Sequence, residues 1–178
     1  MLPFSNARQS RKPSVRFALV LLLLLANLSP AFADGRADWS DYYWRVKSFG
    51  QCIEAPGEGC LTHHAKWDWK RDQWVTVRYE ATSGGIDLAI ALTNNDPHDD
   101  DYVCVTILFA DASNANVAAY HANLHSDPRS TLEHRARVTV AEAALARIAN
   151  VDIGTKQCRQ GAHQDDAIYS AVLSALSR

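Results

Sequence analysis

The chain has no excess of basic residues, and this absence excludes two classes of protein. Four of its 18 basic side chains and none of its 20 acidic ones lie in residues 1–33, which leaves 14 basic and 20 acidic groups and a net charge of −6 in residues 34–178. A nucleic-acid-binding protein needs a basic footprint, and a polybasic lipid anchor needs a cluster of Lys and Arg. Residues 34–178 therefore fit neither class.

The sequence motifs that mark common catalytic sites are also absent. The chain contains no Gly-x-Ser-x-Gly elbow, no His-Glu-x-x-His motif and no glycine-rich loop of the kind that binds phosphate. Neighbouring carboxylates occur only in expected loops or at an expected helix start. The sequence therefore predicts a protein that is not an enzyme and that needs no cofactor.

The first 33 residues are typical of an export signal. A basic segment, Arg8 to Arg16, precedes a largely apolar run of 12 residues, 17–28, and Ala31-Phe32-Ala33 fits a small-x-small cleavage site. This run is too short for a bilayer, which needs about 20 apolar residues, and no second long run follows. We expect cleavage before Asp34, a single exported domain over residues 34–178 in the periplasm or outside the cell, and no stable membrane span after cleavage.

All four cysteines lie after this segment, at positions 52, 60, 104 and 158. An even number of cysteines in an oxidising compartment indicates two disulfides, and the absence of Cys-x-x-Cys makes a thiolate zinc site a poor alternative. Three pairings are possible, and we favour Cys52 with Cys60 and Cys104 with Cys158. Because Cys104 alternates with apolar neighbours, the second pair would place the C-terminal segment over the other face of its strand.

Periodicity predicts a mainly β protein with a helix near each end. Trp39, Tyr43, Val46 and Phe49 recur at helical spacing, which predicts a helix that starts near Trp39 and ends by Gly50. We expect a loop over residues 52–64. The apolar stripe of Ile168, Val172 and Leu176 predicts a C-terminal helix.

Alternating apolar residues predict five short strands between these helices, over residues 74–79, 86–92, 103–109, 117–125 and 134–140. The turn Ser83-Gly84-Gly85 joins the first two as a hairpin. Residues 141–158 fit a short helix, a last strand, or both in succession. Consecutive strands without crossover helices favour an antiparallel β-sandwich.

Residues 86–140 carry a further pattern of strand ends and corners. Its pieces are Leu92-Thr93-Asn94, Val103 to Phe109 with Asp111, Val117 to Leu124, Pro128 to Thr131 and Arg135 to Val140. The pattern resembles the FxLYD-type immunoglobulin-like domains of exported bacterial proteins and the sandwich of desiccation-associated proteins. The chain departs from it where Ile107, Phe109 and Ala110 replace the expected Phe, Leu and Tyr. The resemblance implies an immunoglobulin-like sandwich used as an adhesive or accessory module; fold alone does not define function.

Two groups of polar residues are candidate metal ligands. The histidines are His63, His64, His98, His121, His125, His134 and His163. His121 and His125 are four positions apart on a strand, about 13 Å, too far to share one ion, so solvated surface histidines are the simpler interpretation. Asp96, Asp99, Asp100 and Asp101 could offer oxygen ligands to calcium but lack the pattern of an EF-hand, so a solvated loop is the simpler interpretation.

The tryptophans are concentrated near the start of the exported part, which holds all five of them before Val75. Trp67 and Trp69 would share a strand face beside Lys70 and Arg71, in a charged context. Such a surface could stack on a sugar or anchor a protein interface. We therefore predict a non-catalytic binding protein whose partner is an envelope protein, with a metal- or calcium-binding envelope protein as the alternative.

Overall fold

Eight strands and two helices form the described part of the chain in the computed structural model, which covers residues 35–178 without 55–58, 69, 162 and 178. The expected export signal and its cleavage site lie outside this part. The elements are β1 (Tyr43–Ser48), β2 (Cys60–Asp68), β3 (Gln73–Thr82), β4 (Gly85–Asn94), β5 (Asp101–Asp111), β6 (Asn116–Ser126), β7 (Ser130–Thr139), α2 (Glu142–Leu145), β8 (Ile148–Gln157) and α3 (Asp166–Leu176).

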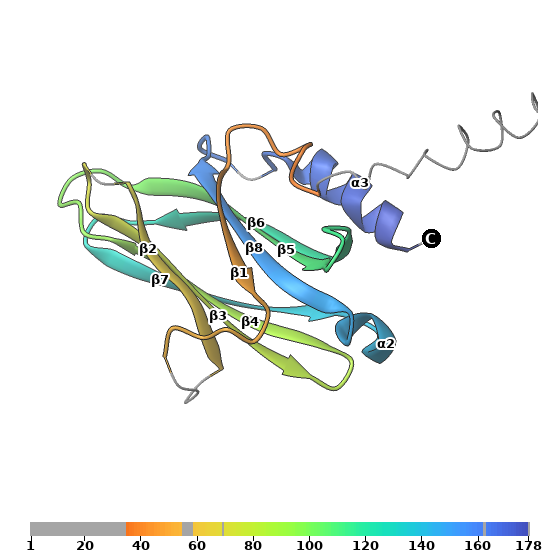
Figure 1. The fold of residues 1–178 in the computed structure, drawn as a ribbon. Helices are drawn as coiled ribbons and strands as arrows, with labels where there is room; N and C mark the ends of the chain where they lie inside the picture. The colour runs from red at the N-terminus through yellow and green to blue at the C-terminus, as the bar shows by residue number, and fades with distance from the viewer. Residues whose placement is uncertain (1–34, 55–58, 69, 162, 178) are drawn as a thin grey trace, which may run out of the picture. The chain divides into compact units, whose positions relative to one another are not determined.

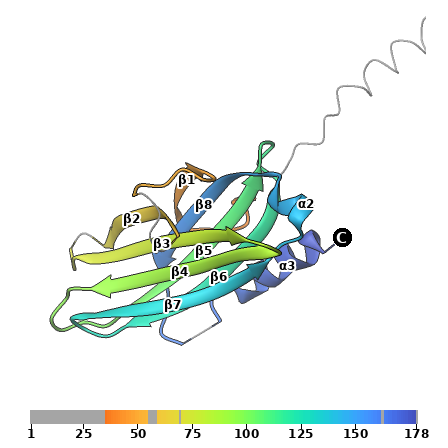
Figure 2. The same cartoon turned by 90° about the horizontal axis from the view of Figure 1, so that it is seen from below.

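The strands form two antiparallel sheets of four strands each. One sheet has the order β1-β8-β5-β6 and the other the order β2-β3-β4-β7 (Figures 1 and 2). Alternate side chains of both sheets meet in one core, which includes Val77 and Leu92 from one sheet and Ile107 and Ile153 from the other. The prediction of a mainly β, antiparallel, two-sheet protein is confirmed.

The hairpin predicted between residues 74 and 92 is also confirmed. β3 pairs with β4 without a register shift, from Gln73 opposite Asn94 to Thr82 opposite Gly85. Gly84 has a φ of +78°, a conformation that glycine adopts without a steric cost, so the turn chemistry agrees with the pairing.

The N-terminal helix predicted over residues 39–50 is wrong, because β1 occupies most of this range. The same residues have a second periodicity, in which Tyr43, Arg45 and Lys47 alternate with Trp44 and Val46. β1 pairs along its full length with β8, and Trp44 lies opposite Gly154. A Cβ atom on Gly154 would come within 2.7 Å of the Trp44 ring, so the glycine leaves room for the indole on the outer face of the sheet. This tertiary pairing outweighs the apolar spacing that suggested a helix.

Both expected disulfides are present, Cys52–Cys60 with Cα atoms 5.1 Å apart and Cys104–Cys158 with Cα atoms 5.4 Å apart. The loop expected over residues 52–64 is shorter than predicted, because β2 already begins at Cys60. The first disulfide therefore closes a loop next to an edge strand, and the second joins the centre of a sheet to the C-terminal segment.

The C-terminal helix is confirmed as α3, and it covers the outer face of the sheet that contains β5, as Cys104 suggested (Figure 1). Leu108 of β5 and Ala119 of β6 are buried on this outer face. Ile168, Tyr169 and other apolar residues of α3 pack against them. β5 is therefore covered on both faces, which explains why almost every one of its residues is buried.

Residues 141–158 form a short helix and then a strand, α2 followed by β8, so both expectations for this segment apply in succession. Neither of the two helices in the described ranges is long and apolar enough to cross a membrane.

The two long sides of the paired sheets are closed in different ways. On one side β6 and β7 are joined by a short turn, and Tyr120 of β6 contacts His134 of β7. On the other side the edge strands β1 and β2 belong to different sheets and are joined by a longer connection, residues 49–59 (Figure 2). We call this second side the open side.

Candidate functional site

The predicted binding residues lie at one end of the open side, but they do not form a shared exposed surface. Trp67 is half-buried, packs against the core and donates its indole N–H to Asp101 Oδ2 at 2.8 Å. Arg71 lies in the turn between β2 and β3 and forms an ion pair with Asp68, whose carboxylate is 3.1 Å away. Lys70 is exposed in the same turn, and Trp69 lies outside the described residues.

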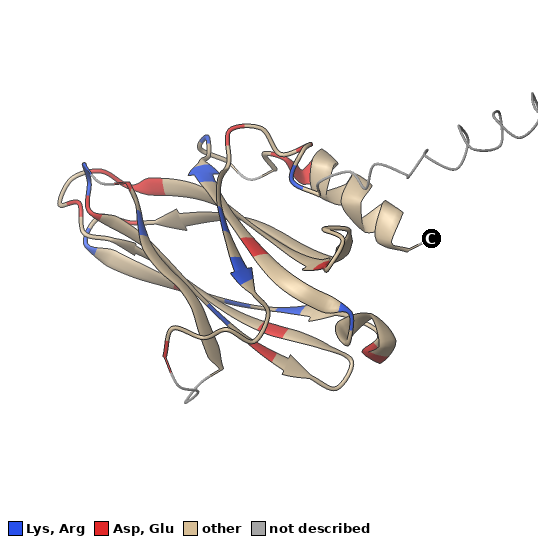
Figure 3. Cartoon of the chain, in the orientation of Figure 1, with Lys and Arg blue, Asp and Glu red and all other residues tan. Residues whose placement is uncertain are grey.

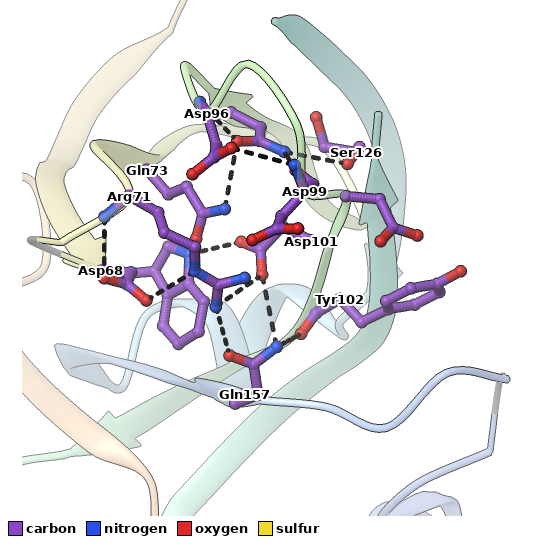
Figure 4. Close-up of polar contacts among 12 residues, drawn as sticks. Asp68, Arg71, Gln73, Asp96, Asp99, Asp101, Tyr102, Ser126 and Gln157 are labelled. Atoms are coloured by element: carbon purple, nitrogen blue, oxygen red, sulfur yellow. Dashed lines mark hydrogen bonds and ion pairs between the residues drawn. The ribbon is translucent and has the colours of Figure 1, made fainter. Parts of the chain in front are cut away.

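Trp67 and Arg71 converge on the carboxylate of Asp101, which is completely buried at the start of β5 (Figure 4). Arg71 Nη2 lies 3.8 Å from Asp101 Oδ1 and donates to Gln157 Oε1 at 2.9 Å. Burial raises the pKa of Asp101, and the partners Trp67, Arg71 and Gln157 act against that rise. This polar cluster joins the turn after β2 to the ends of β5 and β8, so it ties the two sheets together.

A second set of hydrogen bonds holds the loop that follows β4. Asn94 is buried, accepts from Gln73 Nε2 at 3.1 Å and donates to the backbone oxygen of Asp99 at 2.8 Å (Figure 4). Asp96 accepts the backbone N–H groups of residues 98 and 99, and these bonds lower its pKa. The loop is therefore fixed by its own polar groups.

Three of the four aspartates that were considered as calcium ligands contact separate partners. Asp101 belongs to the buried cluster, Asp96 to a backbone turn, and Asp100 lies 3.1 Å from His125 Nε2. The interpretation of a solvated loop is wrong for Asp101, which is buried. Among the described residues, no group of three or more His, Cys, Asp or Glu side chains is arranged to hold a metal ion.

The interpretation of the histidines as solvated is wrong for His63 and His121, each only 7% exposed. His121 lies under α3, with Nδ1 2.9 Å from Thr106 Oγ1 and Nε2 2.9 Å from the backbone oxygen of Gln164. Burial lowers its pKa. In the neutral form one ring nitrogen donates and the other accepts, which satisfies both contacts.

A cleft of about 460 Å³ opens on the open side, next to the buried cluster. It is lined by Asp41, Tyr43, Lys66, Trp67, Thr155, Lys156 and Gln157, from β1 and the segment before it, β2, and β8. Its volume is in the range of ligand sites, and two aromatic rings with several polar groups line it. Trp67 and Gln157 belong both to the lining of this cleft and to the polar cluster around Asp101. The cluster therefore holds two walls of the cleft in place.

The inner face of β1 extends this cleft along the open side. Tyr43, Arg45 and Lys47 are on this face, and Phe49, two residues further on, stacks on Tyr79 in the core. The guanidinium carbon of Arg45 lies 3.7 Å from the centre of the Tyr43 ring. Tyr43 is 61% exposed, so this cation–π pair is accessible from solvent.

His63 of β2 is buried near these cations. Burial, together with the nearby charges of Arg45 and Lys47, lowers its pKa to about 4. His63 is therefore neutral near pH 7 and adds no positive charge beside Arg45 and Lys47.

A second depression, of about 690 Å³, lies between α3 and the segment before β1, and small apolar residues such as Ala167, Ala171 and Ala175 form much of its wall. It offers few polar groups to orient a ligand. The cleft on the open side is the better candidate site because aromatic, cationic and amide side chains converge on it.

Comparison with protein-family models, with curated proteins and with solved structures finds no match to this chain. The functional argument therefore depends on the site itself. Sequence reasoning identified Trp67 and Arg71 but missed Tyr43, Arg45 and Lys47, and it considered His63 only as a metal ligand or a solvated histidine. The alternation of residues 43–49 was the signal that could have found the first three.

Proposed function

We propose that this chain is an exported, non-catalytic binding protein that acts through contact with another protein of the cell envelope. The cleft on the open side supports this proposal most directly, because it presents an exposed tyrosine, a tryptophan edge and cationic side chains on fixed strands. Aromatic and arginine side chains of this kind dominate the binding energy of protein interfaces.

The setting that we propose is the periplasm or the outside of the cell. Two disulfides indicate an oxidising compartment, and they agree with the basic and apolar segments that precede residue 34. An immunoglobulin-like accessory module, as the strand pattern of residues 86–140 suggests, would present a partner-binding edge in this way.

The test is affinity capture of envelope proteins by the exported protein and by two single variants. Tyr43→Ala removes the exposed ring from the cleft, whereas Leu173→Ala removes an exposed apolar side chain from α3, away from it. We expect one stoichiometric protein with the native sequence and with Leu173→Ala, and its loss with Tyr43→Ala. Equal capture by all three proteins, or no capture by any, would refute the proposal.

A further inference from the structure

The outer edge of β1 has no strand beside it in the described part of the chain. The backbone N–H of Phe49 donates to the backbone oxygen of Ala149 in β8, and the register continues unbroken through β1. Because bonded pairs alternate in an antiparallel ladder, residues 43, 45 and 47 bond to β8, and the N–H and C=O groups of Val46 point to the open edge. An extended chain could therefore pair with β1 there.

Two cations on the inner face of this strand have no carboxylate within ion-pair distance among the described residues. They are Arg45, opposite Ile153, and Lys47, opposite Val151, so their stems cover the edge of the core and their charges lie toward the open side. Neighbouring cations differ, because Lys156 pairs with Asp165 and Arg71 with Asp68. Figure 3 shows Lys and Arg, drawn in blue, along β1.

Charges that point inward on an edge strand are known to prevent sheets from joining edge to edge. Two copies of β1 paired with each other would bring Arg45 and Lys47 of both copies together, which is repulsive. The same charges attract a strand that carries carboxylates at facing positions, since cross-strand neighbours are only about 5 Å apart. The arrangement therefore disfavours self-association and selects an acidic partner.

We propose that the outer edge of β1 binds an extended acidic segment of a partner protein, which pairs with the backbone of Val46 and places carboxylates beside Arg45 and Lys47. Val46 itself is 50% exposed on the outer face and offers an apolar contact there. The preferred segment alternates acidic and apolar residues. This inference rests on the proposed function and specifies the chemistry of its partner.

The test uses capped hexapeptides with alternating valine and glutamate, and matched peptides with glutamine or lysine in place of glutamate. Binding to the exported protein is followed by amide chemical shifts and by titration. We expect the glutamate peptide to perturb β1 most strongly, to protect the amide of Val46 from exchange, and to bind about tenfold or more tightly than the glutamine peptide at low salt.

The variant with Arg45→Gln and Lys47→Gln should reduce the affinity for the glutamate peptide to that for the glutamine peptide. Arg129→Gln, which removes an exposed cation from the turn between β6 and β7, is the control and should change it little. Free glutamate at the same carboxylate concentration should not compete, because it cannot form the backbone pairing.

Equal binding of the glutamate and glutamine peptides, no binding at millimolar concentration, perturbation centred on another element, or full competition by free glutamate would overturn this inference. Its failure is separable from that of the proposed function. A captured partner that is lost with Tyr43→Ala but retained by the Arg45 and Lys47 double variant would support the proposed function. The same result would overturn the inference that the partner binds through an acidic segment.

Discussion

The edges of the two sheets are held together by different means on the two long sides of the molecule. On the side of β6 and β7 a short turn keeps the strands together, and few polar groups are needed, such as Tyr120 with His134. On the open side β1 and β2 are joined by a longer connection, residues 49–59, and a buried carboxylate, a disulfide at the start of β2 and inward cations occupy the edge. The side with the longer connection between its edge strands carries the polar groups that a binding site needs.

The largest effect on this comparison is expected from the loss of the buried carboxylate of Asp101, at one end of the open side. Asp101→Ala leaves Arg71, the Trp67 indole and Gln157 without their shared acceptor, and we expect it to lower the free energy of unfolding by about 3–5 kcal/mol. Asp87→Ala, which removes an exposed partner of Arg137, should cost less than about 1 kcal/mol. Chemical denaturation measures both, and similar costs would contradict the central role of Asp101.

The two disulfides should differ in the stability that they contribute. Replacement of Cys104 and Cys158 by serine opens a loop of 54 positions and should cost about 4 kcal/mol in the chain-entropy account. The same change at Cys52 and Cys60 opens a loop of 8 positions and should cost about 2.5 kcal/mol. Urea unfolding of both variants tests the order, which the reverse ranking would refute.

Acidification should lower the free energy of unfolding through His63, which is buried on the open side. Its pKa is about 4 in the folded chain and about 6.5 when unfolded, so the unfolded chain binds the proton first as the pH falls. The free energy of unfolding should therefore decrease by about 3 kcal/mol between pH 7 and pH 4 from this group. His121 acts in the same direction, whereas the raised pKa of Asp101 favours the folded chain at low pH.

Denaturation at several pH values tests whether the free energy of unfolding decreases as the pH falls. His63→Gln should flatten the decline between pH 6.5 and pH 4, and His98→Gln, at an exposed position, should leave it unchanged. A steeper decline in His63→Gln would show that another group dominates.

The smallest expected effect is on the closed side. Tyr120→Phe removes the hydroxyl that contacts His134 and should cost about 1 kcal/mol, because the turn between β6 and β7 still holds the strands together. A loss as large as that of Asp101→Ala, measured by the same denaturation, would remove the difference between the two sides.

Most of the sheet structure could be predicted from local alternation. The hairpin of β3 and β4 and the buried strand β5 have regular apolar positions, and the cysteine spacing suggested both pairings. β1 was missed because Tyr43, Val46 and Phe49 also satisfy helical spacing, and because the residues on its inner face at 45 and 47 are charged. Only its pairing with β8, about 100 residues later, decides between the two.

The site was harder to predict, for reasons that are tertiary. Asp101 ends a run of aspartates that is typical of a solvated loop, and nothing in its neighbours indicates that Trp67 and Arg71 converge on it. His121 is buried because α3 covers its strand face. Trp67 was assigned to the surface from its charged neighbours, whereas the structure shows it half-buried, with its indole N–H directed at Asp101.

The bond between Cys104 and Cys158 also determines how the chain carries tension. A force that pulls on α3 reaches the disulfide before it reaches β8, and then passes directly into the middle strand β5. The intervening strands β6, β7 and β8 lie inside a covalent loop and bear no load along the backbone. In single-molecule stretching, the oxidised chain should therefore extend by a shorter contour length than the reduced chain, by the length of that loop.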